Sequence, residues 1–251
     1  MARIISFATG NIWSWVKSGD KNTLIKFIKN LEVDGVEITF SSKEELYATK
    51  FSSANEKWLK GLKYTTIHAP FNLLRNANDD KEVVKQLEII AGLYHRLNAK
   101  NVIIHPLDLP SPEILARFKF NVSTENLTKK ARALGNSGKK FRLSVAALQK
   151  ILKRYPKIGF CLDVSHAYTW SKQETSRLVE AFCGRTTQIH FSGTYRKKDH
   201  QSLRIVSKDF LGSIEPIFQL KVPFVIEENM IKQAPKFLKE EVRYIRDTFG
   251  G

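Results

Sequence analysis

The stretch Gly159-Phe160-Cys161-Leu162-Asp163-Val164-Ser165-His166-Ala167 indicates the fold. An apolar run ends in Asp163, and His166 follows in what we expect to be the next loop. This pattern is typical of a buried strand that delivers a carboxylate at its C-terminal end, or of a strand-end turn with a polar cap. Carboxylates and imidazoles are both metal ligands, so recurrence of the pattern along the chain favours the first interpretation.

The pattern does recur, in eight β-rich runs that are mostly continuous in apolar residues, as expected for strands buried on both faces. We predict strands at Arg3–Ala8, Gly35–Thr39, Tyr64–His68, Asn101–His105, Phe120–Glu125, Ile158–Asp163, Thr187–Phe191 and Val222–Glu227. Segments of helical period lie between them. We predict helices at Lys21–Leu31, Glu44–Thr49, Asn55–Leu59, Asp79–Leu97, Pro112–Phe118, Ser144–Tyr155, Lys172–Phe182, Ser207–Leu220 and Lys232–Phe249.

Strands that alternate with helices predict a parallel sheet, and right-handed crossovers can close eight such units into a barrel. The 251 residues are close to the ~250 of a typical (β/α)8 barrel. No linker or shift in composition divides the chain. We therefore predict an α/β fold, a single (β/α)8 TIM barrel domain over residues 1–251, with a doubly wound open sheet as the alternative.

The composition bears on partners and on compartment. A net charge of +16 favours a polyanionic partner such as nucleic acid or a phosphorylated substrate, although a generally lysine-rich surface would give the same value. Two cysteines, Cys161 and Cys183, are expected to be reduced core residues. No apolar run reaches about 18 residues and no signal-peptide-like segment opens the sequence, so we expect a soluble, cytoplasmic protein with no membrane partner. We also expect a monomer.

Polar residues stand at the C-terminal ends of the predicted strands, where the active site of such a barrel lies. They are Glu37, His68, His105, Glu125, Asp163, His190 and Glu227, with His166 and His200 in the loops beyond. His95 is the one histidine inside a predicted helix. Carboxylates packed this closely would repel one another, and metal cations would resolve the conflict.

The number of these residues predicts more than one metal ion. A single divalent ion takes four to six ligands, whereas His68, His105, Glu125, Asp163, His166, His190, His200 and Glu227 make eight. Two or three zinc ions would suit this set, and manganese is an alternative. Clustered ions of this kind suit the hydrolysis of phosphate esters.

The chain resembles the xylose-isomerase-like TIM barrels, and within them the endonuclease IV type of apurinic/apyrimidinic endonuclease. The pieces that carry the resemblance are Ile67-His68-Ala69-Pro70, Val102-Ile103-Ile104-His105-Pro106, Thr124-Glu125-Asn126, Cys161 to Ala167, Ile189-His190-Phe191 and Ile226-Glu227-Glu228. The resemblance implies one ion on His68, His105 and Glu125, and a second on Glu125, Asp163, His190 and Glu227. It implies a third ion on His166 and His200.

The chain departs from that family at the third ion. The family usually has Asp-x-His after the seventh strand, but here Lys198-Asp199-His200 puts a lysine in place of the aspartate. Asp199 could substitute after a loop shift, or Lys198 could supply part of the cation's charge.

The DNA-grasping loops of the family are not evident, and basic loops are the candidates to replace them. We predict phosphate contacts from Lys139 and Lys140 after the fifth strand and from Arg196, Lys197 and Lys198 after the seventh. Four loop aromatics, Trp13, Trp15, Tyr168 and Trp170, could stack on bases or a sugar or simply pack their loops; Trp170 is the one that we predict to bind substrate.

Three functions follow from these residues. The first is a metal-dependent hydrolase that cleaves DNA 5′ to abasic sites. The second is an isomerase or epimerase of a small sugar or sugar phosphate, in which Glu125 and Glu227 exchange a proton beside one metal ion. The third is a nucleic-acid-binding barrel whose site is degraded. His68, His105 and the charge favour the first.

Overall fold

The computed structural model describes residues 2–16, 20–74, 79–129, 143–230 and 233–250. Eight parallel strands close into a barrel in the order β1-β10-β7-β6-β5-β4-β3-β2. They are β1 (Ile5–Ala8), β2 (Gly35–Thr39), β3 (Tyr64–His68), β4 (Asn101–Ile104), β5 (Val122–Glu125), β6 (Gly159–Asp163), β7 (Thr186–Phe191) and β10 (Phe224–Ile226). Each predicted strand is present, and the predicted (β/α)8 TIM barrel is confirmed.

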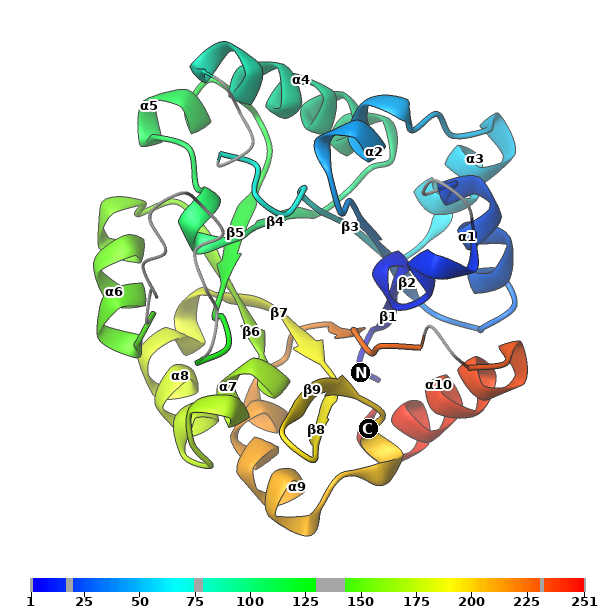
Figure 1. Cartoon of the computed structure of the whole chain (residues 1–251), viewed down its shortest axis with the longest axis vertical. Helices are drawn as coiled ribbons and strands as arrows, with labels where there is room; N and C mark the ends of the chain where they lie inside the picture. Colours follow the sequence, from blue (N-terminus) through cyan, green and yellow to red (C-terminus); the bar gives the residue numbers. More distant parts are fainter. Residues whose placement is uncertain (1, 17–19, 75–78, 130–142, 231–232, 251) are drawn as a thin grey trace.

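The helices surround the ring of strands, and the two chain ends lie close together (Figure 1). They are α1 (Lys21–Ile28), α2 (Lys43–Ala48), α3 (Ser53–Gly61), α4 (Asp80–Arg96), α5 (Pro112–Leu115), α6 (Val145–Arg154), α7 (Val164–Trp170), α8 (Glu174–Phe182), α9 (Lys208–Ile214) and α10 (Pro235–Phe249). Short 3-10 helices add η1 (Thr9–Trp15), η3 (Pro106–Asp108), η4 (Cys183–Arg185), η5 (Leu203–Ile205) and η6 (Glu215–Gln219). Among the described residues, no helix combines the length and apolarity that crossing a bilayer requires.

Helix α4 shows how the sequence fixes these elements. Asp79 caps its first turn by accepting the Glu82 N–H at 2.9 Å. Val83, Leu87 and Ile90 recur at helical spacing and are buried against the barrel. The strands are buried along nearly their whole length, so the core occupies both the inside of the barrel and the layer between strands and helices.

Three local predictions were wrong. The helix expected over Ser207–Leu220 is divided into α9 and η6, because Pro216 lacks the N–H that an α-helix needs. Val164–Trp170, expected as a loop, forms α7, so His166 also lies in a helix. Cys161 is buried as expected, but Cys183 is exposed.

A β-hairpin that the sequence did not predict follows β7. Strands β8 (Gly193–Tyr195) and β9 (Lys198–Gln201) pair antiparallel beside α7 (Figure 1). His200 lies in β9, so the hairpin carries this histidine back toward the barrel.

Candidate metal centre

The predicted ligands gather at the end of the barrel where the strands terminate. His68, Glu125 and Asp163 are the last residues of their strands, and His105 and Glu227 follow directly after theirs. The C-terminal ends of parallel strands meet at one mouth, so five strands can direct side chains at one point. The structure forms three groups of these residues in which possible ligand atoms lie within 4.8 Å of one another.

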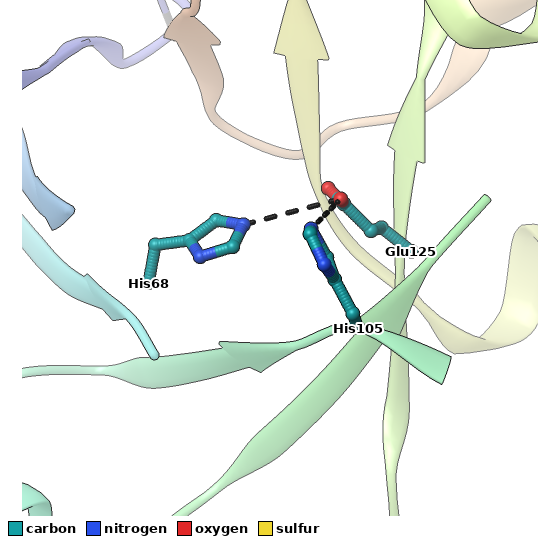
Figure 2. Close-up of side chains that lie close together, drawn as sticks. All are labelled: His68, His105 and Glu125. Atoms are coloured by element: carbon teal, nitrogen blue, oxygen red, sulfur yellow. Dashed lines mark ion pairs between the residues drawn. The ribbon is translucent and has the colours of Figure 1, made fainter. Parts of the chain in front are cut away.

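The first group contains His68, His105 and Glu125 (Figure 2). Glu125 Oε1 lies 2.8 Å from His105 Nε2 and 3.9 Å from His68 Nε2. His68 Nδ1 lies 2.9 Å from the carbonyl oxygen of Ala69, to which it can donate its proton. That tautomer leaves the lone pair on Nε2, the nitrogen that faces Glu125, which is the arrangement of a metal-ligating histidine.

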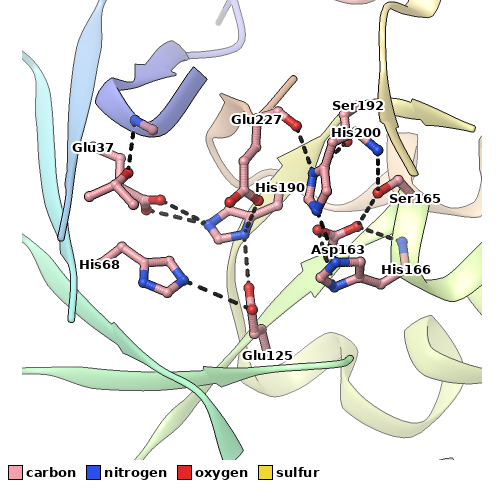
Figure 3. Close-up of polar contacts among 12 residues, drawn as sticks. Glu37, His68, Glu125, Asp163, Ser165, His166, His190, Ser192, His200 and Glu227 are labelled. Carbon is pink, nitrogen blue, oxygen red and sulfur yellow. Dashed lines mark hydrogen bonds and ion pairs between the residues drawn. The ribbon is translucent and has the colours of Figure 1, made fainter. Parts of the chain in front are cut away.

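The central group contains Glu125, Asp163, His190 and Glu227 (Figure 3). His190 Nδ1 lies 2.9 Å from Glu125 Oε2 and 2.7 Å from Glu227 Oε2. These short approaches lack the direction of hydrogen bonds, since the three atoms have no hydrogen-bond partner among the described residues. Glu125 belongs to this group and to the first, so its two oxygens can serve two ions.

Glu37 lies behind His190 rather than among the ligands. Its carboxylate oxygens are 3.2 and 3.4 Å from His190 Nε2, the nitrogen that points away from the central group. Glu37 also accepts from Thr66 Oγ1 at 2.9 Å and from Gln188 Nε2 at 2.8 Å. A proton on Nε2 can be donated to this carboxylate, which leaves Nδ1 free to bind a metal, whereas Gln188 Nε2, 3.1 Å away, can donate to Nε2 in the other tautomer.

The third group contains His166 and His200 with Asp163. The two Nε2 atoms are 3.0 Å apart, and the two Nδ1 atoms each lie 2.9 Å from a backbone carbonyl, of Asn126 and of Glu227 respectively. With both protons on Nδ1, two lone pairs face each other. Two imidazole nitrogens on one zinc ion, each at ~2.0–2.1 Å, are roughly 3.3–3.4 Å apart at the tetrahedral angle, so the pair would have to open by only a few tenths of an ångström to share an ion.

Asp163 supplies a carboxylate to the third group, in which the sequence has Lys198 where the resembled family has an aspartate. Its Oδ1 caps α7 by accepting the His166 N–H at 2.7 Å, while Oδ2 is left toward the ligands. The Lys198 side chain is exposed in β9, and Asp199 lines both the cavity that contains His200 and a second cavity. Neither residue joins a ligand group in the described part of the chain.

Orphaned buried atoms indicate that these groups fit metal ions. Five side-chain atoms in the first two groups are buried without a hydrogen-bond partner among the described residues. They are His68 Nε2, Glu125 Oε2, Asp163 Oδ2, His190 Nδ1 and Glu227 Oε2. Leaving one buried polar atom unsatisfied costs roughly 1–3 kcal/mol, so five in two groups joined by Glu125 indicate shared partners. Imidazole nitrogens with carboxylate oxygens are the ligands of zinc and manganese sites.

The electrostatics of the centre favour bound cations. Burial opposes charge on His68 and His200, yet the surrounding carboxylates raise the pKa of each imidazole to about 9. Burial would likewise raise the pKa of Glu125, but His105 and the other imidazoles lower it well below its ordinary value. The pocket therefore attracts positive charge, whether protons or metal ions, and the two compete for the same atoms.

Cys161 is a neighbour of the centre that sequence reasoning treated only as a core residue. It lies with Glu125 and His190 in a further cluster of possible ligand atoms, and burial raises the pKa of its thiol to about 12. Its spacing from Asp163 was the available signal, because residues two apart on a strand point to the same side.

The predicted substrate contacts are placed less centrally. Arg196 and Lys197 are exposed at the tip of the β8–β9 hairpin. Trp170 lies in α7 rather than in a loop, and its indole N–H donates to the Leu127 carbonyl at 2.8 Å. Lys139 and Lys140 fall outside the described residues.

Solved structures of similar fold include both nucleic-acid and sugar enzymes. Endonuclease IV from Thermus thermophilus superposes with a TM-score of 0.67 at 17% identity over 98% of this chain and 98% of that chain. A D-tagatose 3-epimerase-like protein gives 0.67 at 16% over 97% and 98%. The 3-keto-D-glucoside 4-epimerase of E. coli gives 0.65 at 14% over 98% and 99%. No protein-family model and no curated protein matches the sequence. At these identities the likeness establishes the fold alone, a (β/α)8 barrel.

Proposed function

We propose that the chain is a metal-dependent phosphodiesterase of the endonuclease IV type, which hydrolyses the DNA backbone 5′ to abasic sites. The observation that carries this proposal is the approach of His166 to His200, with both Nδ1 atoms held by carbonyls and both Nε2 atoms turned to a shared point. This pair extends the ligand set beyond the four residues of the central group. A one-ion isomerase would bind its ion with those four alone, and His166 would position the substrate.

Two carboxylates connect the three groups. Glu125 belongs to the first and central groups, and Asp163 belongs to the central and third groups. Divalent ions bound there would supply an activated water and neutralise charge on a phosphodiester. Glu125 and Glu227 each place a carboxylate oxygen within 2.9 Å of His190 Nδ1, so the three side chains could hold one ion between them. No side-chain general base is then required.

The distribution of charge supports a DNA substrate. The chain carries a net charge of +16. Arg196, Lys197 and Lys198 stand on the hairpin that also carries His200. Basic side chains at that position suit the phosphates that flank the cleaved bond.

A sugar isomerase or epimerase is the second candidate, and one observation favours it. Glu125, Asp163, His190 and Glu227 form a complete one-ion site by themselves, with two glutamates available to remove and return a proton. This function leaves His68 and His105 without a metal role, although both are directed at Glu125.

A nicking assay tests the proposal. Protein loaded with zinc or manganese is incubated with a duplex oligonucleotide that carries one abasic-site analogue. We expect a nick on the 5′ side of the lesion, and we expect Glu125→Gln to abolish it. Glu174→Gln is the matched control, because Glu174 is a buried glutamate in α8, outside the three ligand groups. Absence of nicking, with turnover of a ketose or its phosphate that Glu125→Gln abolishes, would replace the nuclease by the isomerase.

A further inference from the structure

A second cavity lies beside the barrel mouth. It has a volume of about 660 Å³ and is lined by segments that follow β5, β6 and β7, with Tyr168, Tyr195 and Ile205 among its walls. Asp199 lines this cavity and also the cavity of about 470 Å³ at the mouth, which contains His200 and Glu227. The two cavities therefore adjoin at the β8–β9 hairpin.

Exposed apolar side chains gather at these two cavities. In the described part of the chain the large hydrophobic side chains that remain exposed are Trp13, Tyr195 and Ile205, at 53, 38 and 49%. Trp13 lines the mouth cavity, and the other two line the second cavity. Exposed apolar side chains grouped around a hollow are typical of a binding site for a partly apolar ligand.

The hairpin turn adds positive charge at a conformational cost. Tyr195 pairs with Lys198 across the hairpin, and the two residues between them, Arg196 and Lys197, have φ values of 49° and 64°. Two-residue turns of this kind favour Asn-Gly, because other side chains are strained at positive φ. A strained pair of basic residues indicates that their charge serves a purpose other than folding.

The chemistry of the lining matches a nucleotide. Lys129, Arg196 and Lys197 provide cations, and the Arg196 guanidinium lies 5.1 Å from the centre of the Tyr195 ring. Tyr168 and Tyr195 provide aromatic surface, on which bases of any sequence can stack. The lining thus offers an aromatic surface to a base and cationic side chains to a phosphate.

We propose that this cavity is a subsite for one nucleotide of a DNA strand, next to the nucleotide at the metal centre. The proposal rests on the proposed function, since it takes the substrate to be DNA. The base lies against Tyr195 and Ile205, and its phosphate is bound by Arg196, Lys197 and Lys129.

Binding of an unmodified single-stranded oligonucleotide, followed by fluorescence anisotropy in the presence of a chelator, tests the subsite without requiring cleavage. The double variant Arg196→Asn, Lys197→Gly should reduce the slope of log Kd against log salt by about 1.4, the value for two lost phosphate contacts on a single strand. The same variant should raise Tm, because Asn-Gly suits the turn. Weaker binding by a more stable protein cannot result from unfolding.

A matched control removes the same charge elsewhere. Lys153→Gln with Lys157→Gln deletes two exposed cations near the C-terminal end of α6, where the chain enters β6 at the opposite end of the barrel. This variant should leave the salt slope unchanged. Tyr195→Ala should weaken binding by roughly 10-fold or more through lost stacking, and Tyr195→Trp should retain it.

The outcomes separate this proposal from the proposed function. An unchanged salt slope and unchanged affinity in the hairpin and Tyr195 variants would overturn the subsite, even if the protein nicks abasic DNA. If the variants lose salt dependence and affinity as predicted but the wild-type protein does not nick abasic DNA, the cavity is a nucleotide site and the proposed nuclease function is overturned.

Discussion

Replacing Glu37 by glutamine should weaken metal binding at the central group without touching any proposed ligand. Glu37 and His190 are both fully buried. Thr66 Oγ1 and Gln188 Nε2 donate to Glu37 Oε2, whereas Oε1 is the oxygen nearest to His190 Nε2, at 3.2 Å. In Glu37→Gln the amide oxygen keeps the two donors, so the new NH2 group faces His190.

The new N–H favours the other tautomer of the imidazole, to which Gln188 Nε2, 3.1 Å from His190 Nε2, can also donate. His190 Nε2 must then accept, and the ring proton moves to Nδ1, which lies 2.9 and 2.7 Å from Glu125 and Glu227. A proton would occupy the position intended for the ion. Loss of such a supporting carboxylate costs 10- to 100-fold in metal affinity, about 1.4–2.7 kcal/mol.

Zinc titration in competition with a chromophoric chelator measures this change. Glu37→Gln should bind the ion of the central group 10- to 100-fold more weakly. Glu37→Asp is the informative control, because it keeps the charge but withdraws the carboxylate from His190; it should also weaken binding. Wild-type zinc affinity in a folded Glu37→Gln protein would refute this reasoning.

Three further outcomes concern stability. The Asp34 carboxylate accepts from Ile5 N, Lys63 Nζ and Arg246 at 3.1, 2.7 and 3.0 Å, so Asp34→Asn should cost about 2 kcal/mol at pH 7 in urea unfolding. Burial opposes the charge of Asp34, but these partners lower its pKa. The stability that Asp34 contributes should therefore be present above its unfolded-state pKa and be lost as the pH falls through its folded-state pKa. A stability difference between wild type and Asp34→Asn that does not change with pH would contradict this. Gly35→Ala should cost about 2–3 kcal/mol in thermal unfolding, because the added methyl collides with the Tyr64 carbonyl and Ser6 Oγ, whereas Gly61→Ala meets open space and should be neutral or slightly stabilising. Chelation should lower Tm, and zinc should restore it. At a hundredfold excess over Kd, bound zinc should add about 2.7 kcal/mol to the free energy of unfolding. A Tm that neither chelator nor zinc changes would argue against the metal centre.

The barrel could be predicted from the sequence because its strands are continuous apolar runs that end in polar residues. The run ending in Asp163 shows this, since the strand stops at the residue that the sequence indicated. The parallel topology then places every such end at one mouth. The assignment of His68, His105 and Glu125 to one group came from the family resemblance, and the structure brings these residues together. Their binding of metal remains a prediction.

Helix α7 could not be predicted because its own residues favour other conformations. Val164, Tyr168 and Thr169 are β-branched or aromatic and have low helix propensity. The helix forms because Asp163 caps its first turn through the His166 N–H. One residue thus both caps the helix and belongs to two ligand groups.

The role of Glu37 and the β8–β9 hairpin could not be predicted from the sequence, for two different reasons. The alternation of a strand shows that Glu37 faces one side of the sheet, but its contact with His190 depends on how distant strands are placed across the barrel. The hairpin turn consists of Arg196 and Lys197, which carry none of the Asn-Gly or Asp-Gly signal that predicts such turns.

Counting bound ions tests the central claim most directly. Native mass spectrometry of the zinc-loaded chain should detect two or three ions, and His166→Ala should hold one fewer. A chain that binds a single ion, with the same count in His166→Ala, would contradict a multinuclear centre and with it the proposed phosphodiesterase.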